Sequence, residues 1–598
     1  MKILKFLKRF KKSKNMLFKD VVNVLEEAEK TTLRLLITEK LANLFKKANP
    51  EEGKYIAYLL AGYVLPNYKG IETGVGIKTI FEALSIATGY SKEEIEKEYK
   101  KINEIGKLAY EMIEKKKQKS LLTKEMTVSD VYKTLMKIAL TTGEGSVELK
   151  KKYVAELFNN SSKEEAKFIA RILLNEIRAG IGEALILDAL SWALIGSKQL
   201  REEIERAYNI CSDIGLVAEL SLKDISLIKN FKVKPFLPLR PALAERLNTA
   251  EEIFNKIGEC AIEYKYDGFR MQVHKENDKI AIYSRRLEEM KNMFPDIEEG
   301  LKKINADFIM EGEAIAYNKK EDKFFSFQET MHRRRKYGIE EASKHYPLKL
   351  FLFDIMYLNG EDLTLKPFKE RRETLEGLMK NYNLENINVS KMKIAKNAND
   401  IEEMFKEAVE KGLEGIMAKD LNAVYKAGKR EFAWIKLKKS YLREIDTIDA
   451  VAVGYFYGKG ERARFGFGGF LVCIYNEDTG KFETIAKVSS GFTESELEEF
   501  KNMCEKIEQE NPDERVFSLI KPDKWIKLKY VVEIMYDEIS ISKQHTAGMA
   551  TKGKGFALRF PRFLRIREDK DIYDVTTLRE VEELYYKQRE KAKKQKNE

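Results

Sequence analysis

The sequence contains few cysteines and few histidines. Cys211, Cys260, Cys473 and Cys504 are spaced too widely for a zinc site built on close pairs or for a small disulfide framework. The presence of only 4 histidines in 598 residues argues against histidine-centred catalysis. The chemistry is therefore expected to depend on Lys, Arg, Asp and Glu side chains.

Long apolar runs are missing as well. No stretch of about 18 apolar residues occurs, so a transmembrane helix is excluded. The N-terminal segment Met1–Phe6 is basic, but no apolar stretch of about 7–15 residues follows it, which argues against a secretory signal. We therefore expect a soluble cytoplasmic protein.

Proline is absent between Pro66 and Pro235. Apolar residues in this interval, such as Phe168, Ile169 and Ile172, recur at the three- and four-residue spacing of a helix. Three prolines then cluster between residues 235 and 241, where a continuous helix is not possible. The pattern predicts an all-α domain over residues 1–234 and a domain boundary after it.

The rest of the chain has the short apolar runs that are typical of β-strands. Short apolar runs alternate with helical patterns up to about residue 440, which predicts an α+β domain over residues 235–440. Short strands separated by turns such as Asn476–Gly480 then predict a small β-barrel over residues 441–598. The expected strands span residues 261–264, 270–274, 280–284, 308–317, 348–358, 415–419, 448–456, 469–475, 481–488 and 530–536, and residues 401–411 are expected to form a helix.

The charge balance is basic. The chain has 108 Lys and Arg residues against 97 Asp and Glu residues, a net charge of +11. A solvated surface of mixed charge would account for this content. The excess of positive charge also favours a polyanionic partner, because each neutralised phosphate releases counterions.

One hexapeptide carries a candidate nucleophile. Lys265–Arg270 reads Lys-Tyr-Asp-Gly-Phe-Arg and follows an expected strand. A lysine nucleophile must lose a proton from an amine whose ordinary pKa is about 10.4, and clustered cations make that loss easier. Further along, the expected strand around Trp434 places Lys436 and Lys438 on one face, because side chains alternate along a strand.

Two acidic strands are candidates for metal ligands. The segments Met310–Ala314 and Leu413–Lys419 each place carboxylates in an otherwise apolar run. A buried carboxylate needs a partner, and Mg²⁺ is a suitable one beside nucleotide phosphates. A structural ion pair would satisfy either segment equally well, so both interpretations stay open.

The order of these motifs resembles that of the covalent nucleotidyltransferases, and in particular the archaeal and eukaryotic replicative ATP-dependent DNA ligases. The resemblance spans nearly the whole chain. It implies that the small barrel of residues 441–598 is an OB-fold and that the protein is associated with the nucleoid if the source is a prokaryote. It continues into two C-terminal motifs, Ala557–Phe563 and Arg567–Lys570. The other motifs in family order are Lys265–Gly268, Ser284–Arg286, Glu311–Glu313, Phe353-Asp354, Glu414–Lys419 and Trp434–Lys438.

This resemblance implies a role for individual residues. Lys265 would form a lysyl-AMP phosphoramidate with ATP, and Mg²⁺ would be the metal, with Mn²⁺ as an alternative. The implied contacts are Glu263 and Phe353 with adenine, Arg270 and Arg285 with nucleotide or nick phosphate, Glu313 with ribose or metal, Glu414 with metal, and Arg430, Lys436 and Lys438 with phosphate.

Segments outside the catalytic motifs also resemble the ligases. The glycine turns Thr142–Ser146 and Arg178–Glu183 resemble turns of the ligase DNA-binding domain, although ordinary helix caps look similar. The basic run His332–Lys336 would either contact the DNA backbone or be solvated. Gln118–Leu122 resembles the sliding-clamp loop with leucines in place of aromatics, and residues 1–15 are either an extension or a misassigned start before Met16.

The sequence therefore predicts a three-domain, monomeric ATP-dependent DNA ligase. It would seal nicks with a 5′-phosphate and a 3′-hydroxyl in double-stranded DNA during replication, repair and recombination. An RNA ligase or an mRNA-capping guanylyltransferase shares the lysine motif, but the long helical N-terminal region and the Arg559–Phe563 stretch argue against both. A non-catalytic DNA-binding scaffold is the alternative of a different class, and lysyl-AMP formation would distinguish the two.

Overall fold

The computed structural model describes residues 15–31, 33–102, 104–117, 125–175, 177, 179–290, 292–318, 323–325, 327–335, 337–438, 446–458, 464–549 and 553–597. The chain divides into two compact units, Met1–Arg240 with Leu287–Glu289, and Pro241–Arg286 with Met290–Glu598. Among the described residues, no helix has both the length and the apolarity needed to cross a membrane.

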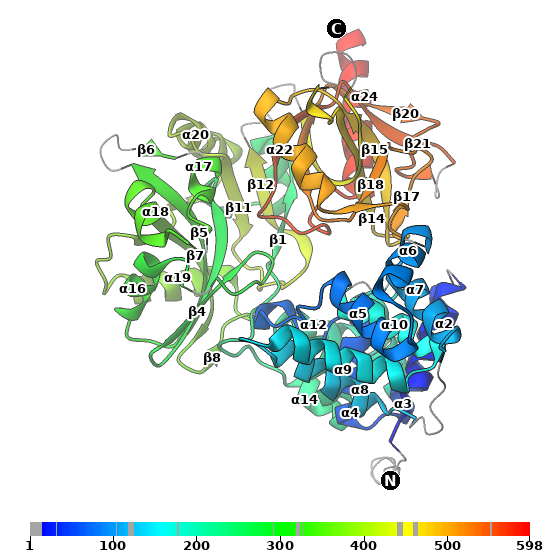
Figure 1. The fold of residues 1–598 in the computed structure, drawn as a ribbon. Coiled ribbons are helices and arrows are strands. Elements are labelled where there is room, and N and C mark those ends of the chain that lie inside the picture. The colour runs from blue at the N-terminus through cyan, green and yellow to red at the C-terminus, as the bar shows by residue number, and fades with distance from the viewer. Residues whose placement is uncertain are drawn as a thin grey trace. The chain divides into compact units, whose positions relative to one another are not determined.

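The first unit is helical, as the sequence predicted (Figure 1). Its 3₁₀ turn spans Asn67–Lys69. Its helices are α2 (Phe18–Glu29), α3 (Arg34–Lys47), α4 (Pro50–Ala61), α5 (Ile77–Thr88), α6 (Lys92–Ile102), α7 (Ile105–Glu114), α8 (Val128–Leu140), α9 (Ser146–Asn160), α10 (Lys163–Leu173), α11 (Glu183–Ile195), α12 (Arg201–Asn209), α13 (Ile214–Lys223) and α14 (Ile225–Lys229).

Local sequence explains where these helices begin. The Ser162 side chain accepts a hydrogen bond from the backbone of Glu165, and the Glu165 side chain accepts one from Ser162, which caps the start of α10. Asn49 and Glu52 form the same reciprocal cap at α4, whose first residue is a proline. The apolar stripe of α10, including Phe168, is fully buried, so the predicted helical period does mark the core.

The second unit begins with two sheets. One sheet has the strand order β1-β12-β11-β2-β10, and the other has β4-β3-β5-β7-β8 with β6 and β9 at its edges. The strands are β1 (Leu243–Arg246), β2 (Cys260–Lys265), β3 (Phe269–Glu276), β4 (Lys279–Ser284), β5 (Phe308–Asn318), β6 (Lys323–Phe324), β7 (Leu348–Leu358), β8 (Glu361–Asp362), β9 (Ile387–Val389), β10 (Met392–Ala395), β11 (Gly415–Asp420) and β12 (Arg430–Lys438). The helices are α15 (Ala250–Ile257), α16 (Pro295–Lys302), α17 (Phe327–Met331), α18 (Ile339–His345), α19 (Phe368–Met379) and α20 (Ala398–Glu410).

A short turn carries the chain from one of these sheets to the other. Lys265 ends β2, and Phe269 begins β3 in the second sheet. At Gly268, a Cβ atom would lie 2.1 Å from the backbone oxygen of Ala314 on β5, so only glycine fits this crossing. The turn therefore places the Lys265 side chain at the junction of the two sheets.

The rest of the second unit is built mainly from a third sheet. Its strand order is β16-β18-β13-β14-β15-β17, with β19 pairing β13 and β22, and β20 pairs β21 separately. In the described residues this order does not close on itself, so the OB-fold barrel stays a prediction. The elements are β13 (Asp446–Phe456), β14 (Gly469–Asn476), β15 (Lys481–Val488), α22 (Glu494–Glu505), β16 (Glu508–Gln509), β17 (Val516–Phe517), β18 (Lys524–Ile526), β19 (Val531–Tyr536), β20 (Glu538–Ser542), β21 (Gly555–Arg559), β22 (Arg562–Ile566) and α24 (Leu578–Asn597).

Candidate active site

The candidate nucleophile Lys265 shares a carboxylate with a second lysine. Glu414 lies just before β11, which runs antiparallel to β2, and its backbone N–H donates to the Lys265 carbonyl at 3.1 Å. Its side chain forms ion pairs with both Lys265 and Lys438. Burial alone would raise the pKa of Glu414, but these two lysines hold it well below its ordinary range. The sequence-predicted residues Lys265, Glu414 and Lys438 are therefore brought together.

Arg270 is held by partners within the chain. It lies on β3, and its guanidinium donates to Glu311 on β5 with a shortest distance of 2.6 Å between Nη2 and Oε2. Its Nη1 also donates to the Ala242 carbonyl at 2.7 Å. The guanidinium carbon lies 5.4 Å from the ring centroid of Phe353 on β7, the predicted adenine-stacking residue. The structure thus places Arg270 and Phe353, two of the predicted nucleotide contacts, beside each other.

The carboxyl group of Glu313 has a pKa above its ordinary value. Desolvation inside the second unit raises the pKa of this carboxyl to about 7. Lys265 and Arg270 act in the opposite direction, whereas the negative charges of Asp569 and Glu414 raise the pKa further. Glu313 and Glu414, the two predicted metal ligands, are thus close enough to influence each other. Among the described residues, no group of three or more His, Cys, Asp or Glu side chains could hold a metal ion.

The predicted adenine contact Glu263 is buried on β2. Its carboxylate forms ion pairs with Lys419 on β11 and with Arg372 on α19, each at 2.7 Å. Neither cation was predicted from the sequence as a site residue. Lys419 is the last residue of the Glu414–Lys419 motif, and a charge in an otherwise apolar strand was the available signal.

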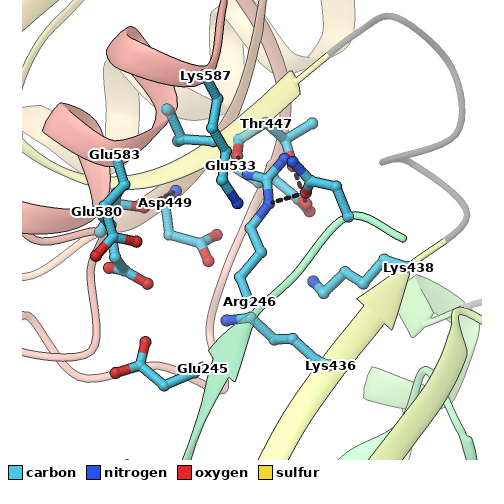
Figure 2. A pocket seen from close by; sticks show the side chains of 13 residues that line it. Glu245, Arg246, Lys436, Lys438, Thr447, Asp449, Glu533, Glu580, Glu583 and Lys587 are labelled. Atoms are coloured by element: carbon cyan, nitrogen blue, oxygen red, sulfur yellow. Dashed lines mark hydrogen bonds between the residues drawn. The ribbon is translucent and has the colours of Figure 1, made fainter. Parts of the chain in front are cut away.

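Three predicted cations lie where the central sheets meet the C-terminal part of the second unit, and they are Arg430, Lys436 and Lys438. Figure 2 shows a pocket in which Lys436 and Lys438 face acidic side chains of β13 and α24, including Asp449 and Glu580. Arg430 forms an ion pair with Glu580 at 2.5 Å. Burial, together with the charges of Lys570 and Arg430, lowers the pKa of Lys436 well below its ordinary range. The pocket therefore contains a lysine whose charged form is destabilised by burial and by neighbouring cations.

The C-terminal motif Arg567–Lys570 reaches this region. Arg567 donates to both oxygens of Asp569 at 2.9 and 2.8 Å and forms an ion pair with Asp449 on β13 at 3.3 Å. Lys570 also forms an ion pair with Asp449. Burial and neighbouring cations lower the pKa of Lys570 to about 8, although Asp449 opposes the shift. Asp449 was missed in the sequence, although it is a carboxylate in an apolar strand, the pattern that singled out Glu313.

Further ion pairs connect the C-terminal motif with the central sheets. The predicted phosphate contact Arg285, just after β4, pairs with Asp574 at 3.2 Å. Arg565 on β22 lies 3.2 Å from Asp267, two residues after Lys265, and also pairs with Glu533 at 2.7 Å. The last sheet is therefore placed over the nucleophile turn in this structure.

The basic run His332–Lys336 is not a uniformly exposed surface. Arg333 is 1% exposed and forms an ion pair with Asp296 at 2.6 Å, so it is unavailable to DNA. The expectation of a DNA contact is wrong for this residue, because its guanidinium is used inside the fold. Lys336 lies outside the described residues.

The two glycine turns of the first unit do precede helices. Gly145 has a φ of 73° and caps α9, and Gly182 caps α11 after Gly180, whose φ is 63°. A Cβ atom at any of these three glycines would meet no atom within 4 Å, so the backbone there is open to an approaching ligand. Arg178, in the second turn, and the clamp-like segment Gln118–Leu122 lie outside the described residues.

Comparisons with known proteins identify the family. Residues 17–191 match "DNA ligase N terminus", residues 241–438 match "ATP dependent DNA ligase domain" and residues 463–570 match "ATP dependent DNA ligase C terminal region". A probable DNA ligase of Dictyoglomus turgidum is 44% identical over 575 residues, which cover 95% of this chain and 97% of the relative. A DNA ligase of Acidianus ambivalens is 41% identical over 593 residues, covering 96% and 98%. With all three ligase regions matched in order around the Lys265 site, the chain belongs to the ATP-dependent DNA ligase family and is a ligase.

Proposed function

We propose that this ligase seals 5′-phosphate, 3′-hydroxyl nicks in duplex DNA through a lysyl-AMP intermediate on Lys265. The observation that carries the proposal is the position of Lys265 at the junction of two sheets, paired with Glu414 and next to Lys438. A phosphoryl group bound there would meet the nucleophile and cations together. Positioning and neutralisation of charge provide most of the catalysis in such a transfer.

Three displacements complete the reaction. The Lys265 amine attacks the α-phosphorus of ATP, a P–N bond forms, and pyrophosphate leaves as the P–O bond breaks. The DNA 5′-phosphate oxygen then attacks the same phosphorus, so AMP passes to the DNA and the lysine amine is released. Finally the 3′-hydroxyl attacks the 5′-phosphate and displaces AMP, which closes the strand.

The nucleotide is held by residues from both sheets. Glu263 and Phe353 contact the adenine, and Glu313 contacts the ribose or a metal ion. The cations Arg270, Arg285, Arg430, Lys436 and Lys438 neutralise phosphate charge. Support for these roles comes from the ion pairs that all of these cations except Lys436 are seen to make with carboxylates of the chain, because incoming phosphates can replace carboxylates as their partners.

The two carboxylates near Lys265 suit Mg²⁺, with Mn²⁺ as an alternative. Mg²⁺ usually takes one or two protein carboxylates and completes its shell with water and substrate phosphates. The pair Glu313 and Glu414 fits that pattern, because Glu414 lies against Lys265 and its charge acts on the carboxyl of Glu313. When bound, the ion supplies positive charge beside the phosphates. Glu414 then orients Lys265 and Lys438 while Glu313 accepts from the ribose or holds the ion.

The finer architecture follows the same proposal. Residues 1–234 would bind duplex DNA, residues 235–440 would carry adenylation, and residues 441–598 would form an OB-fold. The open glycine turns before α9 and α11 support the assignment of DNA binding to residues 1–234. The ion pairs Arg565–Asp267 and Arg285–Asp574 support an adenylation step in which the last sheet lies closed over the turn that follows Lys265. We propose that the enzyme is a cytoplasmic monomer, associated with the nucleoid if the source is a prokaryote, and that it acts in replication, repair and recombination. We also propose that Gln118–Leu122 contacts a sliding clamp.

Labelling tests the proposal directly. Incubation with ATP labelled at the α-phosphate should transfer label to the protein, and Lys265→Ala should abolish this transfer while leaving DNA binding nearly intact. A nicked DNA duplex should be sealed in preference to nicked RNA, and a pre-adenylylated nick should partly restore sealing by the variant. Label transfer that persists in Lys265→Ala would refute the assignment.

A further inference from the structure

Glu263 belongs to a buried cluster of three charges. Lys419 Nζ lies 2.7 Å from Glu263 Oε2, and Arg372 Nη1 lies 2.7 Å from Glu263 Oε1. The exposed fractions of Glu263, Lys419 and Arg372 are 2%, 1% and 3%. Burying ions removes their hydration at a cost of several kcal/mol each, and apolar residues of similar size often serve stability as well. The cluster therefore suggests a role other than stability.

Lys419 connects this carboxylate to the aromatic residues of the site. Its Nζ donates to the Phe353 carbonyl at 3.2 Å and lies 4.7 Å from the centroid of the Phe353 ring. The ring of Trp434, its cross-strand neighbour on β12, is 4.4 Å away. One ammonium group thus fixes both Glu263 and Phe353, the two residues proposed to contact the base.

Arg372 holds the other carboxylate oxygen from the opposite side. Its Nη2 donates to the Ser390 carbonyl at 2.5 Å, and its Nε donates to Glu376 at 2.6 Å. These bonds attach Glu263 to α19 and to the segment between β9 and β10. With one cation on each oxygen, the carboxylate has a fixed plane, and both of its oxygens serve as hydrogen-bond acceptors.

We propose that Lys419 and Arg372 are positioning residues that set the preference of this ligase for a purine with a 6-amino group. The inference rests on the proposed function, in which Glu263 and Phe353 contact the adenine. An immobile carboxylate oriented by the two cations accepts the N–H of a 6-amino group. A 6-oxo group would present lone pairs to the same oxygens, so two acceptors would face each other without a hydrogen between them. A carboxylate released from either cation could rotate away from the base and then tolerate a 6-oxo purine.

Nucleotide transfer to the protein tests this inference. ATP, ITP and GTP, each labelled at the α-phosphate, should be compared as kcat and KM for adduct formation on the full chain. Wild type should prefer ATP to ITP. In Lys419→Met and in Arg372→Met the ATP-to-ITP ratio of kcat/KM should fall at least about tenfold. Lys419→Arg keeps the charge and should restore part of the ratio, and it also serves if Lys419→Met fails to fold.

A matched control separates positioning from general destabilisation. Arg333 is equally buried in the same unit and ion-paired with Asp296, but it contacts neither Glu263 nor Phe353. Arg333→Met should lower stability and leave the ATP-to-ITP ratio unchanged. Glu263→Gln carries an amide that can donate or accept, so adding Lys419→Met in that background should cause no further change in the ratio.

The outcomes are distinct. An unchanged ratio in both Lys419→Met and Arg372→Met, or an equal drop in Arg333→Met, would overturn the inference while leaving ATP-dependent adduct formation in place. A wild type that accepts ITP as readily as ATP would overturn it too. Failure of the wild type to form any adduct with ATP would instead refute the proposed function, and the inference with it.

Discussion

Replacing Glu313 by glutamine should make the protein more stable at alkaline pH while impairing adenylation. Desolvation and the charges of Asp569 and Glu414 raise the pKa of Glu313 to about 7 in the folded chain, against 4.5 as the ordinary value. The folded state therefore binds more protons than the unfolded state between these two values. Stability contributed by the neutral carboxyl is present below about pH 4.5 and is lost as the pH rises through about 7.

The size of the effect follows from the shift. Each pKa unit corresponds to about 1.4 kcal/mol, so ionised Glu313 opposes folding by roughly 3–4 kcal/mol at pH 8. Glu313→Gln removes this penalty. A small part of the penalty is already present at pH 5, so relative to wild type the variant should gain roughly 2–3 kcal/mol between pH 5 and pH 8, or roughly 3 °C in Tm for a unit of this size. Self-adenylylation should nevertheless fall about a hundredfold, because a contact to the reacting nucleotide is lost.

Unfolding curves at pH 5, 6, 7 and 8 provide the measurement, together with label transfer from ATP. Glu311→Gln is the matched control two residues away on β5, because Glu311 is fully buried and paired with Arg270 at 2.6 Å. Its loss leaves a buried cation unpaired and should destabilise the protein by about 3–5 kcal/mol at every pH. A stability difference between Glu313→Gln and wild type that does not change with pH would refute the reasoning.

Three further predictions concern other parts of the chain. Lys570→Ala should slow self-adenylylation at least about tenfold and barely change sealing of a pre-adenylylated nick, as measured by label transfer and gel assay; an equal effect on both steps would exclude a step-specific role. Removing residues 1–234 should reduce nick affinity, and the slope of log affinity against log salt, far more than it reduces self-adenylylation, whereas equal losses would assign the helical unit to folding. Stimulation by a sliding clamp should be lost in Leu121→Ala with Leu122→Ala, and stimulation that survives would place the main contact elsewhere.

The sequence predicted regular elements well where one periodicity dominates. Strands β7 and β15 have the predicted bounds, and the long proline-free interval is helical. The predicted Lys265, Glu414 and Lys438 do meet, because β2, β11 and β12 are neighbours in one sheet. Partners that depend on tertiary packing were not predictable. Sequence spacing gave no sign that Arg372, far from β2 along the chain, would contact Glu263.

For Arg333, the sequence pattern indicated the wrong environment. Arg333 lies in a run of cations, a pattern typical of a solvated or DNA-facing segment, yet it is buried and paired with Asp296 on α16. A run of like charges therefore does not reveal which member turns inward. The opposite case is Asp449, a single acid among apolar residues, whose partners Arg567 and Lys570 come from a motif more than a hundred residues later.

The pairing of Asp449 with Arg567 and Lys570 has a consequence for protein engineering. All three residues belong to the segment after residue 445, so their mutual contacts are inherited together when that segment is exchanged. A chimera carrying residues 446–598 of a relative with the same three residues would keep this internal pairing intact. Its fit to the recipient would be decided where the two parts meet, notably at the pairs Asp267–Arg565, Arg285–Asp574 and Arg430–Glu580. Transplanted segments should therefore be matched at these three pairs first.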